Sequence, residues 1–219
     1  MGGGIPPLNP VPTEVTTGAT GALLGAVVIA GIRSLRRAVP PSPRLAVWTA
    51  AFSAFAAAAF LGTLVHAFDL GPTLTDLLWQ PLYLLLGVAL ALFTVGAQAD
   101  WRGWPTARRW LPWALASALG FYLMTRLQHG DYLVFVLFEG VALLWALGVY
   151  TALARRRWPG ATMVALGLLL SIVAGGLQAT TLGFTLVWPF DHNSLYHLGQ
   201  LVGVLALVRG LRSRLSASP

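Results

Sequence analysis

Few side chains in this 219-residue chain could hold a metal ion or move protons: four histidines and seven carboxylates, with no cysteine. Three of the histidines, His66, His192 and His197, lie in or beside long apolar segments, as do Asp76 and Asp191. Neutral imidazoles from two segments, with carboxylates nearby, suit a zinc ion, which binds nitrogen and oxygen ligands tetrahedrally. Zinc lowers the pKa of a bound water to about 7 and makes it a nucleophile. The chemistry indicated is hydrolysis, and the lack of cysteine excludes thiolate sites.

The composition predicts that these groups lie within a membrane. Apolar residues make up 57% of the chain and charged residues 10%, whereas soluble domains average about 25% charged residues. Apolar segments with the length and hydropathy of membrane spans recur along the chain. They cover residues 18–35, 45–68, 74–97, 110–124, 132–154, 161–182 and 195–208. The sequence therefore predicts an all-α fold, an integral membrane bundle of seven transmembrane helices.

One membrane domain accounts for the whole chain. We expect an extracytoplasmic tail over residues 1–17, the seven-helix domain over 18–212 and a cytoplasmic tail over 213–219. The first seventeen residues contain no basic group, so a cleavable secretory signal is not expected. The fourth and seventh segments are the shortest, and each reaches spanning length only if its polar flank begins the helix.

The arginines predict the orientation in the membrane. The chain has fourteen basic residues and all are arginine. Except for Arg126, they lie in alternate connections or after the last segment, which places those regions in the cytoplasm and the N-terminus outside. They are Arg33, Arg36, Arg37 and Arg44; Arg102, Arg108 and Arg109; Arg155, Arg156 and Arg157; and Arg209, Arg212 and Arg214.

The same composition limits the partners. Basic residues scattered between apolar runs do not form the single basic face of a nucleic-acid-binding protein. The lack of lysine excludes a retinal Schiff base. We expect membrane lipids as partners, one of them a possible substrate. The arginine-only, alanine-rich composition favours a multi-pass protein of a bacterial plasma membrane.

Once this topology is imposed, the ionisable groups gather in the outer leaflet. His66 lies late in the second segment, Asp76 starts the third, and Asp191, His192 and His197 start the seventh. An ionisable side chain within a membrane is costly and usually faces a cavity, a partner or a metal. His129 and Asp131 lie in the outer connection before the fifth segment.

The start of the seventh segment carries a resemblance to a known family. Residues 190–200 read FDHNSLYHLGQ, which resembles the final-helix motif of the CREST superfamily of seven-span membrane proteins. This superfamily includes the alkaline ceramidases and the progestin and adipoQ receptors. The resemblance implies a zinc ion held by His66, His192 and His197, with Asp76 as catalytic base or water-positioning group. It also implies hydrolysis of an amide or ester bond in a lipid.

The sequence departs from that motif at two places. Asn193 stands where the family has its first histidine, and His192 comes one residue early. Residues 192 and 197 are about 140° apart on a helix, so His192 reaches the ion only if the helix begins at Asn193. Gly62 stands where the family has a serine whose hydroxyl would stabilise an oxyanion. Losing such a hydrogen-bond donor can lower the rate of an enzyme roughly a hundredfold. Whether the protein is an enzyme therefore stays open.

Other interpretations of the same residues also stay open. Asp191, with Asn193 and Ser194, could cap the seventh helix, and Asp76 could favour the start of the third through the helix dipole. In the non-catalytic alternative the protein is a sensor, a receptor-like bundle or a structural protein, and the polar residues form a hydrogen-bond network.

Glu139 lies about seven residues into the fifth segment, so it is protonated, paired or facing a polar cavity. Gln178 and Gln200 are its candidate partners. A proton pathway through Glu139 is the last alternative, because no second carboxylate is predicted deep in the membrane. Gly175 and Gly176 are predicted to allow close helix packing.

Overall fold

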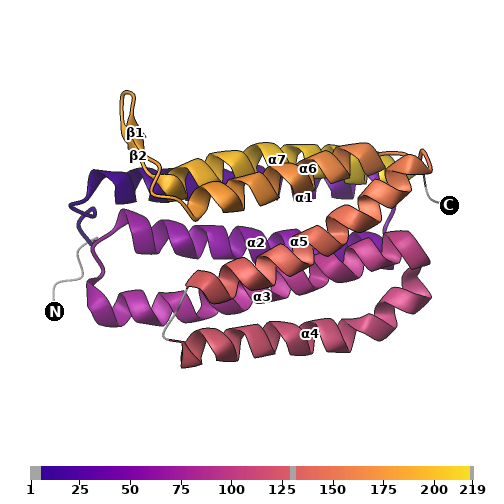
Figure 1. Cartoon of the computed structure of the whole chain (residues 1–219), viewed down its shortest axis with the longest axis horizontal. Helices are drawn as coiled ribbons and strands as arrows, with labels where there is room; N and C mark the ends of the chain where they lie inside the picture. Colours follow the sequence, from indigo (N-terminus) through magenta and orange to yellow (C-terminus); the bar gives the residue numbers. More distant parts are fainter. Residues whose placement is uncertain (1–5, 129–131, 218–219) are drawn as a thin grey trace.

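The computed structural model describes residues 6–128 and 132–217, and within them it contains seven helices and one short β-hairpin (Figure 1). The predicted positions of His129 and Asp131 lie outside the described residues. The elements are α1 (Pro12–Ala38), α2 (Pro43–Ala67), α3 (Gly71–Arg102), α4 (Trp104–Leu127), α5 (Tyr132–Arg155), α6 (Ala161–Gln178), β1 (Phe184–Thr185), β2 (Pro189–Phe190) and α7 (His192–Ser216).

Local signals explain where the helices begin and end. Each of α1 to α4 has a proline in its first turn, where a missing backbone N–H costs nothing. The Ser42 side chain also caps α2 by accepting a hydrogen bond from the N–H of Leu45. Gly103 separates α3 from α4 with a φ of 83°, a left-handed conformation that favours glycine.

The helices confirm the predicted class of fold. Six of them in the described part of the chain are long and apolar enough to cross a membrane, so the protein is an all-α membrane helix bundle. The helix outside this set, α4, has 24 residues and carries Arg108 and Arg109 near its start. At about 1.5 Å per residue it is roughly 36 Å long. Its polar flank is therefore part of the helix, which is the condition that the sequence set for this segment to reach spanning length.

Several helix ends differ from the predicted segments. Helix α3 runs on to Arg102, and α7 begins at His192 and continues to Ser216. Helix α6 ends at Gln178, before the β-hairpin that leads to α7. Helix α1 starts at Pro12, so part of the predicted tail is helical. The polar residues at the start of α7 are helical because a side-chain cap satisfies backbone N–H groups there.

Six of the helices form a closed ring. Around it the neighbours are α1, α2, α3, α5, α6 and α7, and α7 packs on α1 again. Helix α4 lies outside the ring along α3 (Figure 1). Side chains from all six ring helices can therefore meet inside the bundle, whereas α4 contributes little to its interior.

The two ends of the bundle differ in charge. The connections 39–42, 103 and 156–160 and the end of α7 lie at one end, here called the arginine-rich end. The start of α1 and the connections 68–70 and 179–191 lie at the other, here called the N-terminal end. The start of α1 and the end of α7 lie at opposite ends (Figure 1). Which end faces the cytoplasm stays a prediction.

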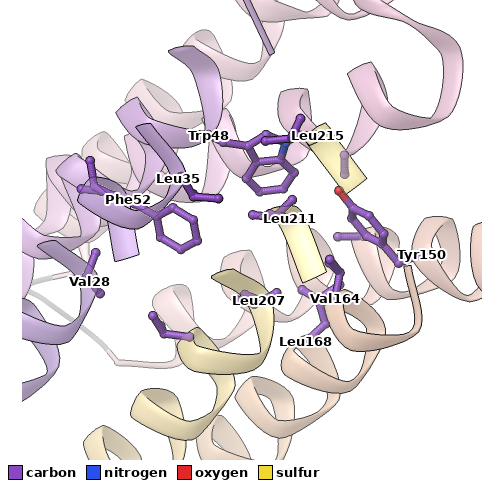
Figure 2. Close-up of a cluster of buried hydrophobic side chains, with 14 of the residues drawn as sticks. Val28, Leu35, Trp48, Phe52, Tyr150, Val164, Leu168, Leu207, Leu211 and Leu215 are labelled. Carbon is purple, nitrogen blue, oxygen red and sulfur yellow. The ribbon is translucent and has the colours of Figure 1, made fainter. Parts of the chain in front are cut away.

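The main hydrophobic core occupies the half of the bundle near the arginine-rich end (Figure 2). Trp48 is fully buried, and its ring meets that of Phe93 edge to face at 4.7 Å between centroids. Gly96 makes room for the indole, since a Cβ there would lie 2.7 Å from it. Phe52 and Tyr150 complete this aromatic layer across the ring.

Helices α6 and α7 pack at their closest through glycines. A Cβ at Gly167 would lie 2.7 Å from the carbonyl oxygen of Gly203, and one at Gly210 would clash in the same way with α6. Small residues let helix backbones approach in this manner. The prediction for Gly175 and Gly176 is wrong: a Cβ at Gly176 would meet nothing within 4 Å, and Gly175 faces Glu139.

Candidate functional site

A cavity of about 360 Å³, here called the main cavity, lies inside the ring toward the N-terminal end. Its wall is largely apolar and aromatic, with contributions from Phe55, Tyr83 and Phe135. The polar side chains on the wall come from three different helices and are His66, Gln178, His192 and Asn193.

A smaller space of about 60 Å³, the inner cavity, adjoins the main cavity toward the middle of the bundle. The two share wall residues Phe55, Phe135 and Tyr196. Its polar lining residues are Glu139, Ser171 and Gln200. The two spaces together have polar groups at both ends and apolar walls between them.

A third hollow, of about 660 Å³, lies at the N-terminal end of the bundle and is here called the acidic vestibule. The carboxylates of Glu14, Asp69 and Asp76 line it. His66 and Trp79 line both the vestibule and the main cavity, and their rings meet edge to face at 5.7 Å. These two side chains therefore stand between the vestibule and the cavity.

His66 is held by a carboxylate from α1. Its Nδ1 lies 2.6 Å from Oε2 of Glu14. The chain before α1 runs over this region, because the N–H of Asn9 donates to the carbonyl of Ala67 and the N–H of Asp69 donates to that of Pro7. The carboxylate fixes the ring orientation and leaves Nε2 for another contact.

His197 turns toward α1 and does not line the main cavity. Its Nδ1 lies 3.1 Å from the hydroxyl of Thr20 and 3.2 Å from the carbonyl oxygen of Thr17. Its Cε1 lies 3.3 Å from the position of a Cβ at Gly21. The absence of a side chain at Gly21 thus creates the space for this imidazole between α1 and α7.

The start of α7 is fixed by a capping box. The N–H of Ser194 donates to Oδ1 of Asp191 at 2.8 Å, and the Ser194 hydroxyl oxygen accepts from the N–H of Asp191 at 2.9 Å. Asp191 is therefore the helix cap, as one interpretation predicted. The arrangement in which α7 begins at Asn193 and His192 belongs to the loop is wrong, because this cap makes His192 the first helical residue.

Hydrogen bonds set the charge state of Asp191. Burial alone would raise the pKa of its carboxyl, but bonds from the Ser194 N–H and the Thr17 hydroxyl outweigh this and hold the pKa below its usual value. Asn193 points differently: its Oδ1 accepts from Nε2 of Gln178 at 3.1 Å. At the start of α7, Asp191 therefore caps the helix, whereas Asn193 lines the main cavity.

The predicted zinc ligands meet only part of what zinc needs. Metal-binding histidines usually hold their second ring nitrogen against an oxygen, and both His66 and His197 do so. His66 and His192 line the main cavity, whereas His197 faces α1. In the described ranges no three His, Asp or Glu side chains gather as a metal site. Catalytic zinc uses three protein ligands, so the set is incomplete and zinc stays a prediction.

The two predicted acidic residues lie in different places. Asp76 is exposed on the second turn of α3 and lines the acidic vestibule, outside the main cavity. Glu139 is only 8% exposed and faces the inner cavity, where the Tyr196 hydroxyl lies 3.4 Å from its Oε1. Its predicted neighbour Gln200 lines the same cavity, whereas Gln178 bonds Asn193.

A charged cluster at the arginine-rich end was missed by the sequence analysis. The side chain of Asp100 is completely buried, and its Oδ2 accepts from the Tyr150 hydroxyl at 2.6 Å. Oδ1 lies 3.6 Å from Arg44 and 3.7 Å from Arg214. Arg214 also lies over the ring of Trp158 at 4.4 Å. A lone acid two residues before Arg102, directly after the uncharged run Gly-Ala-Gln-Ala at 96–99, was the available signal.

A second carboxylate bears on the proton pathway: Asp100 is buried in the protein near the end of α3. It lies at the arginine-rich end, so the expectation that no second carboxylate lies deep in the membrane stays a prediction. Helix α3 continues past the predicted segment and carries Asp100 into the interior.

The fold and these cavities define a multi-pass membrane bundle with a mostly apolar internal cavity. Residues 16–216 match a family of unknown function, DUF6962, and the chain belongs to that family. No curated protein and no solved structure matches the chain. The resemblance to the CREST superfamily stays a prediction.

Proposed function

We propose that this protein binds a small amphipathic, lipid-like molecule inside its ring of helices, as a receptor-like or sensor protein. The observation that carries the proposal is the main cavity. Ligand sites are typically about 300–1,000 Å³, mostly apolar, with a few placed polar groups. The main cavity has this size and this kind of wall.

The arrangement of the polar groups supports an amphipathic ligand over a purely apolar one. His192 and Asn193 line one end of the cavities, and Ser171 and Gln200 line the other. Residues 193 and 200 are separated by seven positions of α7, or roughly 10 Å. A ligand of about that length has its apolar part against the aromatic wall. The proposed setting is a bacterial plasma membrane, with the cavity toward the outside.

The test is binding of a neutral amphiphile, 4-phenylbutanol, to the purified full-length chain by isothermal titration calorimetry. A leucine at Gly62 enters the main cavity, because a Cβ there meets only Leu82, at 3.6 Å. Gly148 is exposed on α5 with open space around it. We expect Gly62→Leu to weaken binding at least tenfold and Gly148→Leu to bind like the parent chain. Equal binding by both variants, or no binding by the parent chain, would contradict the proposal.

The second candidate function is a zinc-dependent hydrolase of lipid amide or ester bonds. The observation that favours it is the oxygen partner at Nδ1 of both His66 and His197, which leaves each Nε2 available for a metal. Elemental analysis of protein expressed with added zinc tests this, beside the variant His66→Ala/His197→Ala. About one zinc per chain, lost in the variant, is the supporting result. No zinc in the parent protein would remove this candidate.

A further inference from the structure

We infer that the ligand carries a cationic nitrogen, an alkyl- or arylammonium group, which pairs with the carboxylate of Glu139 in the inner cavity. This inference rests on the proposed function, because it names the chemical class of the molecule that enters the main cavity.

Glu139 has too few partners for a buried carboxylate. It is 8% exposed, and the one hydrogen bond that it accepts from the described residues, from the Tyr196 hydroxyl, is long at 3.4 Å. No cationic side chain within residues 6–128 and 132–217 forms an ion pair with it. Burying an isolated carboxylate is costly unless a cation pairs with it. A ligand ammonium would supply the missing charge.

The surroundings of Glu139 suit an organic cation. Phe52, Phe93 and Tyr196 line the inner cavity together with Phe55 and Phe135, and aromatic faces attract ammonium groups. The inner cavity is about 60 Å³, which is room for a small charged group, while the main cavity next to it holds the apolar part. An inorganic ion fits less well, since no three acidic or histidine side chains in the described chain gather around one point.

The acidic vestibule independently favours a cation. The chain has a net charge of +7, yet Glu14, Asp69 and Asp76 all line the hollow that leads to His66. A site lined by charges of one sign raises the local concentration of the opposite charge. The carboxylates thus lie where an incoming ammonium would first meet the protein.

A proton relay explains Glu139 less well. Along α5, Glu139 and Tyr150, the partner of the other buried acid, are eleven positions apart, or roughly 16 Å. Leu143 and Ala146 lie buried between them, and the aromatic layer of Trp48 and Phe93 crosses the ring. The interior between the two acids is therefore filled with apolar and aromatic side chains along α5 and across the ring.

The experiment compares two probes of the same shape, 4-phenylbutylamine and 4-phenylbutanol, by calorimetry on the full-length chain. We expect the parent chain to bind the amine at least tenfold more tightly than the alcohol. Glu139→Gln keeps the size of the side chain and removes its charge, so it should bind both probes with similar affinity. Glu139→Asp retains the charge and should keep part of the preference for the amine.

Each outcome decides between the two proposals. Equal affinity of the parent chain for both probes would overturn the inference and leave the proposed function standing. The same holds if Glu139→Gln is folded by circular dichroism and still prefers the amine. If neither probe binds the parent chain, the proposed function fails and this inference fails with it.

Discussion

The two ends of the bundle each bury a carboxylate but satisfy it in different ways. Asp100 at the arginine-rich end meets Tyr150, Arg44 and Arg214, which come from three other helices. Glu139, toward the N-terminal end, lines the inner cavity and lies 3.4 Å from the hydroxyl of Tyr196. Tyr150 and the charges of Arg44 and Arg214 offset part of the desolvation cost of Asp100 within the protein, although its Oδ1 has no hydrogen bond among the described residues. For Glu139 we propose that the ligand offsets this cost.

The packing around the two acids follows the same division. Trp48 and its neighbours fill the ring beside Asp100 in the main core. Near Glu139, glycine at position 175 and the inner cavity leave space. We therefore expect substitutions at the arginine-rich end to change stability, and those at the N-terminal end to change binding more than stability.

The largest effect should follow from Asp100→Asn. Without the carboxylate, the charges of Arg44 and Arg214 lose their partner, and breaking a buried ion pair from one side costs about 3–5 kcal/mol. The free energy of unfolding, measured in mixed detergent with increasing dodecyl sulfate, should fall by this amount. The double variant Asp100→Asn/Arg214→Gln should recover part of the loss. An unchanged unfolding curve for the single variant would refute the structural role.

A smaller loss is expected for Tyr150→Phe, which removes the hydroxyl that donates to Asp100 at 2.6 Å. Leaving a buried acceptor with one bond fewer costs about 1–3 kcal/mol. Tyr196→Phe is the matched variant at the other acid. It should lose less stability, because its bond to Glu139 is 3.4 Å, while it changes probe binding. Equal stability losses in the two variants would remove the contrast between the acids.

Asp191→Ala removes the cap of α7 and should cost about 1 kcal/mol. The effect should also depend on pH. Because the pKa of Asp191 is lower in the folded protein, its stabilising contribution is present above the usual aspartate pKa of about 3.9 and is lost as the pH falls through the folded value. Thermal unfolding of the two proteins between neutral and acidic pH measures this. A stability difference that grows as the pH falls would contradict it.

The smallest stability change is expected at the His66–Glu14 pair. The two side chains are 18% and 33% exposed, and pairs that solvent reaches contribute only about 0–1 kcal/mol. Glu14→Gln should therefore hardly alter the unfolding midpoint, and added salt should reduce even that difference. A loss as large as that of Asp100→Asn would show that the N-terminal end is also a structural centre.

The sequence by itself determined the class of fold and much of the local structure. Long apolar segments need a membrane or a large core, whatever their neighbours are. The cap at Asp191 follows from residues within one turn of each other. Alternate connections between successive antiparallel helices lie at the same end of a bundle. Because most of the arginines are in or beside such alternate connections, they gather at one end.

The tertiary structure alone decided which polar residues share a site. Of the predicted group, His66, His192 and Asn193 line one cavity, His197 faces α1, and Asp76 lies in the vestibule. Asp100 found its partners only because α2, α5 and α7 converge on α3. A sequence gives the direction of a side chain relative to its own helix. What that side chain meets depends on the order and rotation of the helices in the ring, which packing over the whole chain decides.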